Sequence, residues 1–425
     1  MLLRADHVGQ GRASVVRYHL LATDYDGTLA HGGAVSERTL DALKRLLGSG
    51  RKLVMVTGRE LPDLKRVFSH LDLFELVVAE NGALLHRPAT KATERLAAPP
   101  PPEFVAQLRE RGVGPMSVGE VVVATWEPHS QAVLDAIRDL GLELQVIFNK
   151  GAVMVLPTGV NKASGLAAAL RELKMSPHNV VGVGDAENDH SFMKLCEVAV
   201  AVENALPAVK DTADLITEGD HGNGVTELVE HLLRDDLASV APRLARRRLT
   251  FGDDARGEVK LEPYGGCVLI CGASASGKST VARRLVESLR EQAYQFCLVD
   301  PEGDYETLGG AVVVGKPTAP PPLDEALQLL EDVGVNGVVC LTGVPISDRP
   351  GYFVDLFSGL LQMRVRYGRP HWLVLDEAHH LMPAAWQPPI GMLPDHLRNM
   401  VLVTVHPELL AREVLQRVTH VIAAG

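Results

Sequence analysis

The sequence predicts an α/β protein built from two parallel-sheet units, and three observations lead to that fold class. Apolar strand-like runs alternate with amphipathic helical segments along most of the 425 residues, an order that produces parallel strands joined by crossover helices. Polar residues follow the ends of several of these strands. Residues 235–262 mix charge, proline and glycine without a strong period, and they separate two such series. At about 150 residues per domain, the length allows two or three folding units.

The composition is that of an ordinary globular chain. Hydrophobic residues make up 46% and charged residues 22%, which excludes a mostly disordered or fibrous protein. The 42 basic and 53 acidic residues leave a net charge of −11, so nucleic acid is not favoured as a partner. No apolar run reaches the ~20 residues that span a bilayer, and no signal-type stretch opens the sequence. The five cysteines lack a paired zinc spacing, and we expect a cytoplasmic protein with no membrane partner.

The first unit is predicted to span residues 17–85 and 156–234, after an extension at 1–16. In such a sheet, the polar residues at strand ends gather along one edge, where ligands bind. Its elements in order are a strand in YHLLATDYDGTLA, a helix over 36–47 capped by Ser36, the strand KLVMVTGR, a helix over 61–70, the strand LVVAENG, then a helix from Lys162, the strand NVVGVGD, a helix from Asn188 and the strand EVAVAV.

Residues 86–155 interrupt this pattern and predict a small α/β insert. Residues 235–262 are predicted as a linker and residues 263–425 as the second unit. The run Arg246–Arg248 in the linker is either solvated, which is favoured, or in contact with a phosphate backbone. The elements of the insert are a helix over 103–111, the strand VGEVVVATW, a helix over 131–140 and two strands around 145–156.

Clusters of polar residues fall at strand ends or helix starts of the first unit. Asp24 and Asp26 flank one residue past a strand, and carboxylates so close repel unless a cation or a shared proton relieves them. Thr57 ends another strand and offers its hydroxyl and backbone N–H to a phosphoryl oxygen. Lys162 begins a helix, where its ammonium and the helix N-terminus favour an anion. The last cluster shares one face of a helix start and has oxygens that suit Mg²⁺: Asp185, Asn188 and Asp189.

The series DYDGTL, VTGR, GVNK and GDAENDHSFM resembles the haloacid dehalogenase-like (HAD) superfamily over about residues 17–234. The insert resembles the type C2 cap of the Cof-type branch, which includes sugar phosphatases and phosphoglycolate phosphatase. The resemblance implies a Rossmann-like parallel sheet with an inserted cap, and a Mg²⁺-dependent phosphatase acting on a small phosphomonoester. Three cap residues could face the substrate, although surface or cap-core positions are favoured for them: Arg111, Trp126 and His129.

The resemblance also implies roles for the polar residues. Asp24 would be the nucleophile that forms an aspartyl-phosphate, and Asp26 would protonate the leaving oxygen and later activate water. Thr57 and Lys162 would hold the phosphoryl group, and Asn188 would orient it or a metal ligand. The implied Mg²⁺ ligands are the Asp24 carboxylate, the Asp26 main-chain carbonyl and Asp185, with Asp189 in or next to the coordination shell.

A second ligand site follows from GASASGKS at 272–279, which matches the P-loop pattern between an apolar strand and a helix. Its backbone N–H groups would cradle ATP phosphates, Lys278 would reach the β and γ oxygens, and Ser279 would bind Mg²⁺. The later strand HWLVLDEAHHL ends at Asp376, which would hold this Mg²⁺, and Glu377, which would polarise the attacking water. The predicted nucleotide-binding residues are Gly272, Ala273, Ser274, Ala275, Ser276, Gly277, Lys278, Ser279 and Thr280.

FCLVDPEGDY, LDEAHHLMP and VLVTVHPE together resemble the HerA/FtsK-type branch of RecA-like ATPases over about residues 263–425. The resemblance implies a RecA-like P-loop NTPase domain in which Asp300, Glu302 and His406 sense the nucleotide. It also allows a homo-oligomer through this domain, with an arginine finger supplied in trans. The candidates for that finger are Arg369, Arg412 and Arg417.

Three interpretations of the whole chain stay open. The first is a phosphatase of small esters fused to an ATP-binding and ATP-hydrolysing domain that regulates, oligomerises or couples it. The second is a nucleic-acid end-processing enzyme, against which stand the acidic charge and a cap that would obstruct a polymer end. The third makes the second unit a nucleotide sensor whose hydrolysis is incidental.

Overall fold

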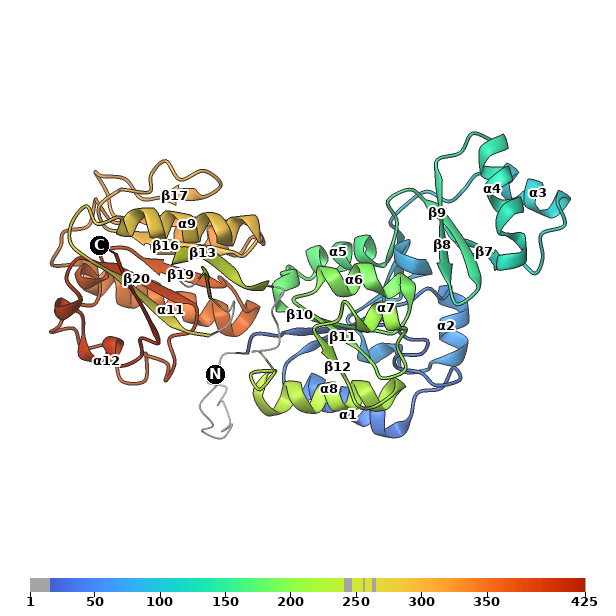
Figure 1. The fold of residues 1–425 in the computed structure, drawn as a ribbon, viewed down its shortest axis with the longest axis horizontal. Coiled ribbons are helices and arrows are strands. Elements are labelled where there is room, and N and C mark those ends of the chain that lie inside the picture. Colours follow the sequence, from blue (N-terminus) through green and yellow to red (C-terminus); the bar gives the residue numbers. More distant parts are fainter. Residues whose placement is uncertain (1–15, 241–246, 255–256, 262–264, 425) are drawn as a thin grey trace, which may run out of the picture.

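The computed structural model describes residues 16–240, 247–254, 257–261 and 265–424. They form two α/β units side by side, with the cap of the first unit at the end remote from the second unit (Figure 1). The predicted extension at 1–16 lies outside the described residues except for Val16. Within the described ranges, no helix is both long enough and apolar enough to cross a membrane.

The first unit is built on one sheet whose central strand is β1 (Leu20–Thr23). Among the described residues this sheet has eight strands in the order β12-β11-β10-β1-β2-β3-β4-β5. The six from β12 to β3 run parallel, and β4 and β5 add antiparallel. The predicted parallel α/β core is confirmed. The other strands are β2 (Lys52–Val56), β3 (Leu76–Ala79), β4 (Leu84–Arg87), β5 (Ala92–Arg95), β10 (Val180–Gly184), β11 (Val198–Ala201) and β12 (Leu215–Ile216).

Helices cover both faces of this sheet (Figure 1). The predicted N-cap is confirmed, because the Ser36 hydroxyl accepts the Thr39 N–H at 3.2 Å. Asn161 caps α5 by accepting the Ser164 N–H at 3.0 Å, and this fixes where Lys162 enters the helix. The helices are α1 (Glu37–Gly48), α2 (Leu61–Val67), α5 (Lys162–Glu172), α6 (His190–Leu195), α7 (Pro207–Lys210) and α8 (His221–Asp235).

The cap is an antiparallel sheet in the order β6-β7-β9-β8 with two helices packed on it. Its start differs from the predicted residue 86, because β4 and β5 extend the main sheet instead. All four side chains of β5 are exposed, so this edge strand lacks the apolar alternation that marks a strand in sequence. The cap elements are α3 (Pro102–Glu110), β6 (Ser117–Val118), β7 (Val123–Trp126), α4 (Ser130–Asp139), β8 (Leu144–Asn149) and β9 (Ala152–Pro157).

The segment predicted as a linker, 235–262, contains a hairpin. Strands β13 (Leu249–Asp254) and β14 (Gly257–Leu261) pair antiparallel. Leu249 and Leu261 are buried in the hydrophobic core of the second unit. The hairpin therefore belongs to the second unit.

The second unit is a parallel sheet in the order β17-β18-β16-β19-β20-β15-β21. The strand that precedes the P-loop, β15, lies between β20 and β21, and β19 lies beyond β20. The elements are β15 (Cys267–Cys271), α9 (Lys278–Glu291), β16 (Phe296–Asp300), β17 (Val312–Val314), α10 (Leu323–Leu330), β18 (Gly337–Cys340), α11 (Arg349–Tyr367), β19 (Trp372–Leu375), β20 (Met400–Thr404), α12 (Arg412–Leu415) and β21 (His420–Ala423).

The two units meet through a buried network of charged and aromatic side chains. Glu197 accepts hydrogen bonds from the Arg17 guanidinium and from the Tyr294 hydroxyl, the latter at 2.8 Å. Its other oxygen lies 2.6 Å from Nδ1 of His178, whose ring stacks on Tyr294 with centroids 3.8 Å apart. Arg247 Nε lies 3.6 Å from the same carboxylate. Arg247 of the predicted linker therefore binds the first unit, which argues against both alternatives at this position, whereas Arg246 lies outside the described residues.

This interface lies at the amino ends of strands from both sheets. Asn179, just before β10, donates to the Gly368 carbonyl at 3.1 Å, and its Oδ1 lies 3.3 Å from Nε2 of His371, just before β19. The C-terminal end of α9 is also here, because the Gln292 carbonyl lies 2.8 Å from a His178 ring nitrogen. Arg369 is fully buried and donates to main-chain carbonyls. Arg369 is therefore ruled out as an arginine finger for a neighbouring copy.

We expect Glu197→Ala to destabilise the folded chain by about 3 kcal/mol, because it removes a buried carboxylate on which hydrogen bonds from both units converge. Burial alone would raise the pKa of Glu197, but Arg17 and His178 outweigh burial and lower the pKa below its usual 4.5. The stabilisation is therefore complete above that pH and is lost as the pH falls further. Urea unfolding at neutral and acidic pH measures both effects.

The matched control is Glu94→Ala, which removes an exposed carboxylate paired with Arg87. This change should cost no more than about 1 kcal/mol at any pH, as is usual for surface ion pairs. If Glu197→Ala were no more destabilising than this control, the interface network would not stabilise the fold.

Candidate functional site

Polar side chains of the first unit collect at the carboxyl edge of its sheet. Asp24 follows β1, Thr57 follows β2 and Asp185 follows β10. Because β1 lies between the other two strands, these three positions are neighbours. Lys162, the first residue of α5, reaches the same edge, and its Nζ donates to Asp24 Oδ1 at 2.6 Å. The sheet therefore brings together residues that are far apart in the sequence.

Three buried carboxylates converge at this edge. Oxygens of Asp24, Asp185 and Asp189 lie within 4.8 Å of one another. Lys162 Nζ bridges Asp24 and Asp189. The second Asp189 oxygen accepts the main-chain N–H groups of Asp185 and Ala186, each at 2.9 Å. Asp189 therefore holds its neighbours in place, whereas Lys162 leaves one oxygen of Asp24 for another partner.

The charges of this cluster favour an additional cation. Burial and the nearby Asp189 raise the pKa of Asp24, although Lys162 opposes them. Burial also raises the pKa of Asp185, against the effect of Lys150. Lys150 belongs to the cap, and its Nζ lies 2.5 Å from Asp185 Oδ2, so an ammonium group already neutralises part of the cluster. Since Mg²⁺ prefers carboxylate oxygens, the residues present fit the predicted metal.

Asp26 lies at the same edge and is bound by a residue that the sequence did not identify. Arg59 donates to both Asp26 oxygens, from Nε at 2.6 Å and from a terminal nitrogen at 2.7 Å. Arg59 also pairs with Asp63 on α2. The available signal was the VTGR motif, in which this arginine stands two residues after Thr57. A forked arginine fixes the plane of the carboxylate, so Arg59 orients Asp26.

Two predicted phosphate-binding residues have other partners. The Thr57 N–H, expected to face a phosphoryl oxygen, donates to the Val78 carbonyl at 2.8 Å because it continues the pairing of β2 with β3. That part of the prediction is wrong, and the buried Thr57 hydroxyl accepts the Arg59 N–H at 3.1 Å. Asn188 donates to Asn81 Oδ1 at 3.0 Å. Within the described residues, Asn188 Oδ1 is buried without a hydrogen-bond partner. This amide oxygen can therefore accept a hydrogen bond from a bound ligand.

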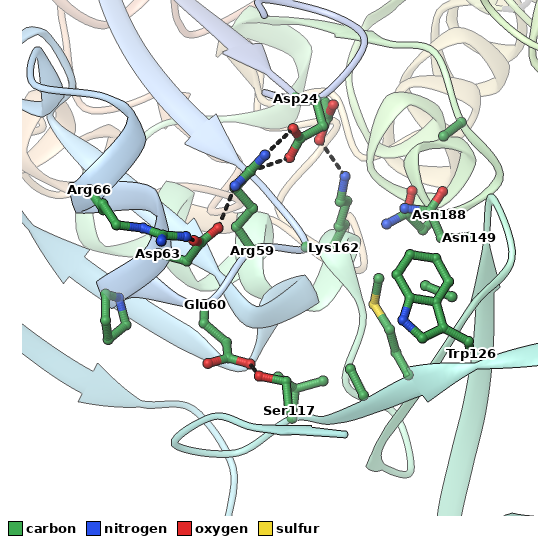
Figure 2. Close-up of a pocket in the computed structure, with 18 residues that line it drawn as sticks. Asp24, Arg59, Glu60, Asp63, Arg66, Ser117, Trp126, Asn149, Lys162 and Asn188 are labelled. Atoms are coloured by element: carbon green, nitrogen blue, oxygen red, sulfur yellow. Dashed lines mark hydrogen bonds and ion pairs between the residues drawn. The ribbon is translucent and has the colours of Figure 1, made fainter. Parts of the chain in front are cut away.

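A cavity of about 770 Å³ lies between this edge and the cap (Figure 2). The core lines it with Lys162 among other residues, and the cap adds Trp126 and Asn149. The Trp126 side chain is half exposed, so a broad apolar surface faces the cavity. The other two cap candidates bond within the cap instead: His129 with the Gly114 carbonyl and Arg111 with Asp139.

Glu80 of the AENGA segment holds the cap on the core. Its buried carboxylate accepts the main-chain N–H groups of residues 120–122, which join β6 to β7, at 2.8 to 2.9 Å. A Cβ at Gly119 would lie 2.6 Å from Glu80 Oε1, so glycine allows this close approach. The cap is therefore fixed over the acidic cluster by backbone hydrogen bonds as well as by Lys150.

In the second unit, the P-loop turns from β15 into α9 at the predicted residues. Gly277 has φ +96°, a conformation that favours glycine. A Cβ at Gly272 would lie 2.2 Å from the Ala424 carbonyl oxygen. Ser276 Oγ is buried with no hydrogen-bond partner in the described part of the chain, and Lys278 Nζ donates to the Ala273 carbonyl at 2.8 Å. The exposed residues of the loop and helix start are Ala273, Ser274, Ala275, Gly277, Ser279 and Thr280.

Asp376 and Glu377 directly follow β19. Burial and the adjacent Glu377 raise the pKa of Asp376 to about 7. Burial and Glu302 raise the pKa of Glu377, whereas Lys278 of the P-loop opposes the shift. Among the described residues no group hydrogen-bonds Glu377 Oε2, which is buried 3.3 Å from His379 Nδ1. This oxygen therefore faces the His379 ring rather than open solvent.

Asp300 does not have the role implied for a nucleotide sensor. It is fully buried, and its carboxylate accepts main-chain N–H groups of the residues that follow, including Gly303 at 2.8 Å and Tyr305 at 2.9 Å. Asp300 therefore shapes the loop after β16. Glu302 and His406 are exposed after the ends of β16 and β20, and their sensing role stays a prediction.

Comparison with known proteins identifies the first unit. Residues 21–110 and 116–229 match the family described as haloacid dehalogenase-like hydrolase. A phosphoglycolate phosphatase of Halorubrum lacusprofundi is 30% identical over 222 residues, which are 50% of this chain and 96% of that protein. The chain belongs to the haloacid dehalogenase-like hydrolases. A phosphoglycolate phosphatase of Methanothermobacter thermautotrophicus is 29% identical over 222 residues, 50% of this chain and 98% of that protein.

A solved haloacid dehalogenase-like hydrolase of Bacteroides thetaiotaomicron is 21% identical and covers 51% of this hydrolase and 99% of its own chain, with a TM-score of 0.46. Residues 262–409 match the family described as AAA domain. The predicted HAD unit and P-loop unit are thus confirmed as families, and the chain is a HAD-type hydrolase that carries an AAA domain. The HerA/FtsK branch stays a prediction.

Proposed function

We propose that the first unit hydrolyses a small phosphomonoester through an aspartyl-phosphate formed on Asp24. The observation that carries this proposal is the position of Asp24. It follows the central strand, binds Lys162 at 2.6 Å, belongs to the carboxylate cluster with Asp185 and lines the cap-covered cavity. A carboxylate nucleophile beside an ammonium group and a cation site is suited to attack a phosphate dianion.

In the proposed reaction, an Asp24 oxygen attacks phosphorus, and the bond from phosphorus to the ester oxygen breaks. Asp26 gives its proton to that oxygen and later takes a proton from the water that cleaves the aspartyl-phosphate. Arg59 donates one hydrogen bond to each Asp26 oxygen, which leaves a second lone pair on each oxygen for the proton that is transferred. Lys162 neutralises the attacking group. Mg²⁺ would offset the repulsion between carboxylate and phosphate, held by the Asp24 carboxylate, the Asp26 carbonyl and Asp185, with Asp189 beside it.

We propose that the AAA domain binds and hydrolyses ATP with Mg²⁺. Lys278 would bind the β and γ phosphates, Ser279 and Asp376 would hold the metal, and Glu377 would polarise the attacking water. The buried Ser276 Oγ supports this proposal, because it is a polar atom that lacks a hydrogen-bond partner within the described chain. The exposed loop residues that precede Lys278 support it as well. The remaining loop residues would offer backbone N–H groups to the phosphates.

The cavity has room for a sugar phosphate as well as for phosphoglycolate as the substrate of the first unit. A volume of about 770 Å³ lies within the range of pockets for drug-sized ligands. Trp126 adds an apolar face for the flat side of a sugar ring. The cap held by Glu80 covers the site, and this arrangement opposes the entry of a polymer end.

A substrate panel tests the proposal. With MgCl₂ present, we expect kcat/KM for hexose phosphates to exceed that for a 3′-phosphorylated oligonucleotide at least ~100-fold, since the polymer cannot enter without displacing the cap. Phosphoglycolate is the third substrate, and each is measured with and without ATP. A preference for the oligonucleotide would instead support nucleic-acid end processing.

A further inference from the structure

We propose that Lys150 of the cap competes with the divalent cation for Asp185 and, once the cation is bound, contributes to holding the phosphate dianion. This inference rests on the proposed phosphatase function and assigns a role to a residue outside the sequence motifs. Lys150 lies in the turn between β8 and β9 with φ +49°. From there its side chain crosses to the core, where Nζ lies 2.5 Å from Asp185 Oδ2.

Residues of the core leave space for the contact between Lys150 and Asp185 and hold the Asp185 carboxylate in place. The Asp185 carboxylate is buried and also accepts the Thr28 hydroxyl at 3.0 Å. A Cβ at Gly27 would lie 2.8 Å from Lys150 Nζ and 2.4 Å from Asp185 Oδ2. Only glycine leaves room there for the ammonium group to reach the carboxylate. Lys150 is therefore placed on a proposed metal ligand rather than on the cap surface.

Charge determines what this placement does. The cluster contains three carboxylates, from Asp24, Asp185 and Asp189, and two ammonium groups, from Lys150 and Lys162. Its formal charge is therefore one negative. A divalent cation turns this into one positive charge, whereas without Lys150 the same cation leaves the cluster neutral. Lys150 thus opposes cation binding before substrate arrives.

The Lys150 charge has the opposite effect on binding when phosphate is present. A phosphate dianion brings two negative charges to the cation-loaded cluster, and each remaining positive group then favours binding. Lys150 is about half exposed, in contrast to the buried Lys162. It can leave Asp185 without leaving the neighbourhood, because its backbone is fixed in the cap and the cap is anchored at Glu80. The residue thereby makes tight cation binding depend on the phosphate.

Calorimetric titrations test these two opposite effects of Lys150, on Mg²⁺ binding and on phosphate binding. Relative to wild type, Lys150→Met should bind Mg²⁺ about tenfold more tightly in the absence of phosphate, since one charge–charge contact is removed at a half-exposed position. With saturating Mg²⁺, the same variant should bind inorganic phosphate about tenfold more weakly. Lys150→Arg keeps the charge and should resemble wild type in both titrations. Arg138→Met changes an exposed cap cation remote from the cluster and serves as the control.

The outcomes separate this inference from the phosphatase proposal. Unchanged or weaker Mg²⁺ binding in Lys150→Met overturns the competition, and so does a parallel loss of both affinities, which would indicate a structural role. Asp185→Asn is measured alongside, and it should weaken Mg²⁺ binding in every background. If wild type bound no Mg²⁺, or if Asp185→Asn had no effect on binding, the metal site of the proposed function itself would be wrong.

Discussion

Asp24→Asn should lower kcat for a phosphomonoester by at least ~10³-fold, because the amide cannot form the covalent intermediate. The measurement is phosphate release from p-nitrophenyl phosphate at saturating Mg²⁺. The substitution is nearly isosteric, and the amide oxygen can still accept the Lys162 hydrogen bond seen at 2.6 Å. The variant should therefore fold normally.

Stability supplies the control for this prediction. Asp24 lies within 4.8 Å of Asp185 and Asp189, and removing one negative charge relieves their repulsion. In the presence of a chelator, Asp24→Asn should therefore melt at the same temperature as wild type or higher. Asp41→Asn, on the exposed face of α1, should change neither activity nor melting. A wild-type rate in folded Asp24→Asn would falsify the assignment of the nucleophile.

Glu377→Gln should reduce ATP turnover ~10²- to 10³-fold, because a general base of this kind contributes on that scale. Nucleotide binding should persist, since Lys278 and the P-loop are unchanged. The assay is best done in an Asp24→Asn background, where the phosphatase site cannot release phosphate from the nucleotide. Turnover and the binding of a fluorescent ATP analogue are then measured on the same preparation.

This experiment also distinguishes an ATPase from a nucleotide sensor. Glu408→Gln is the matched control, because Glu408 lies close by, exposed and paired with His406. If turnover were equal in Glu377→Gln, Glu408→Gln and the parent chain, Glu377 would not be the base. If the parent chain bound ATP without measurable turnover, the second unit would act as a sensor.

The sequence was sufficient to predict the residues of the acidic cluster because two of them follow parallel strands and Asp189 lies at the helix start just after Asp185. Asp24 and Asp185 come after short apolar runs, and neighbouring parallel strands end at one edge. The same logic found Lys162 at the start of a helix. It could not find Lys150, which lies in a hairpin turn of the cap, 35 residues before its partner Asp185. A lysine beside a glycine in such a turn resembles any solvated turn residue.

Other errors have equally local causes. The Thr57 N–H was expected to be free, but the strand pairing continues one residue beyond the apolar run, so this group donates to Val78. The edge strand β5 has four exposed side chains, and its pattern resembled a loop. Arg59 lay within a predicted motif, yet its partner Asp26 became evident only when the ends of β1 and β2 were seen side by side.

The junction at the amino ends of the two sheets constrains how the enzyme can work. From that junction, α9 runs 14 residues, about 20 Å, to the P-loop, while β10 runs five residues, about 16 Å, to the acidic cluster. The acidic cluster and the P-loop thus lie on opposite sides of the junction, each in its own unit. Any coupling between the two sites therefore has to pass through the side chains that join the two units at this junction.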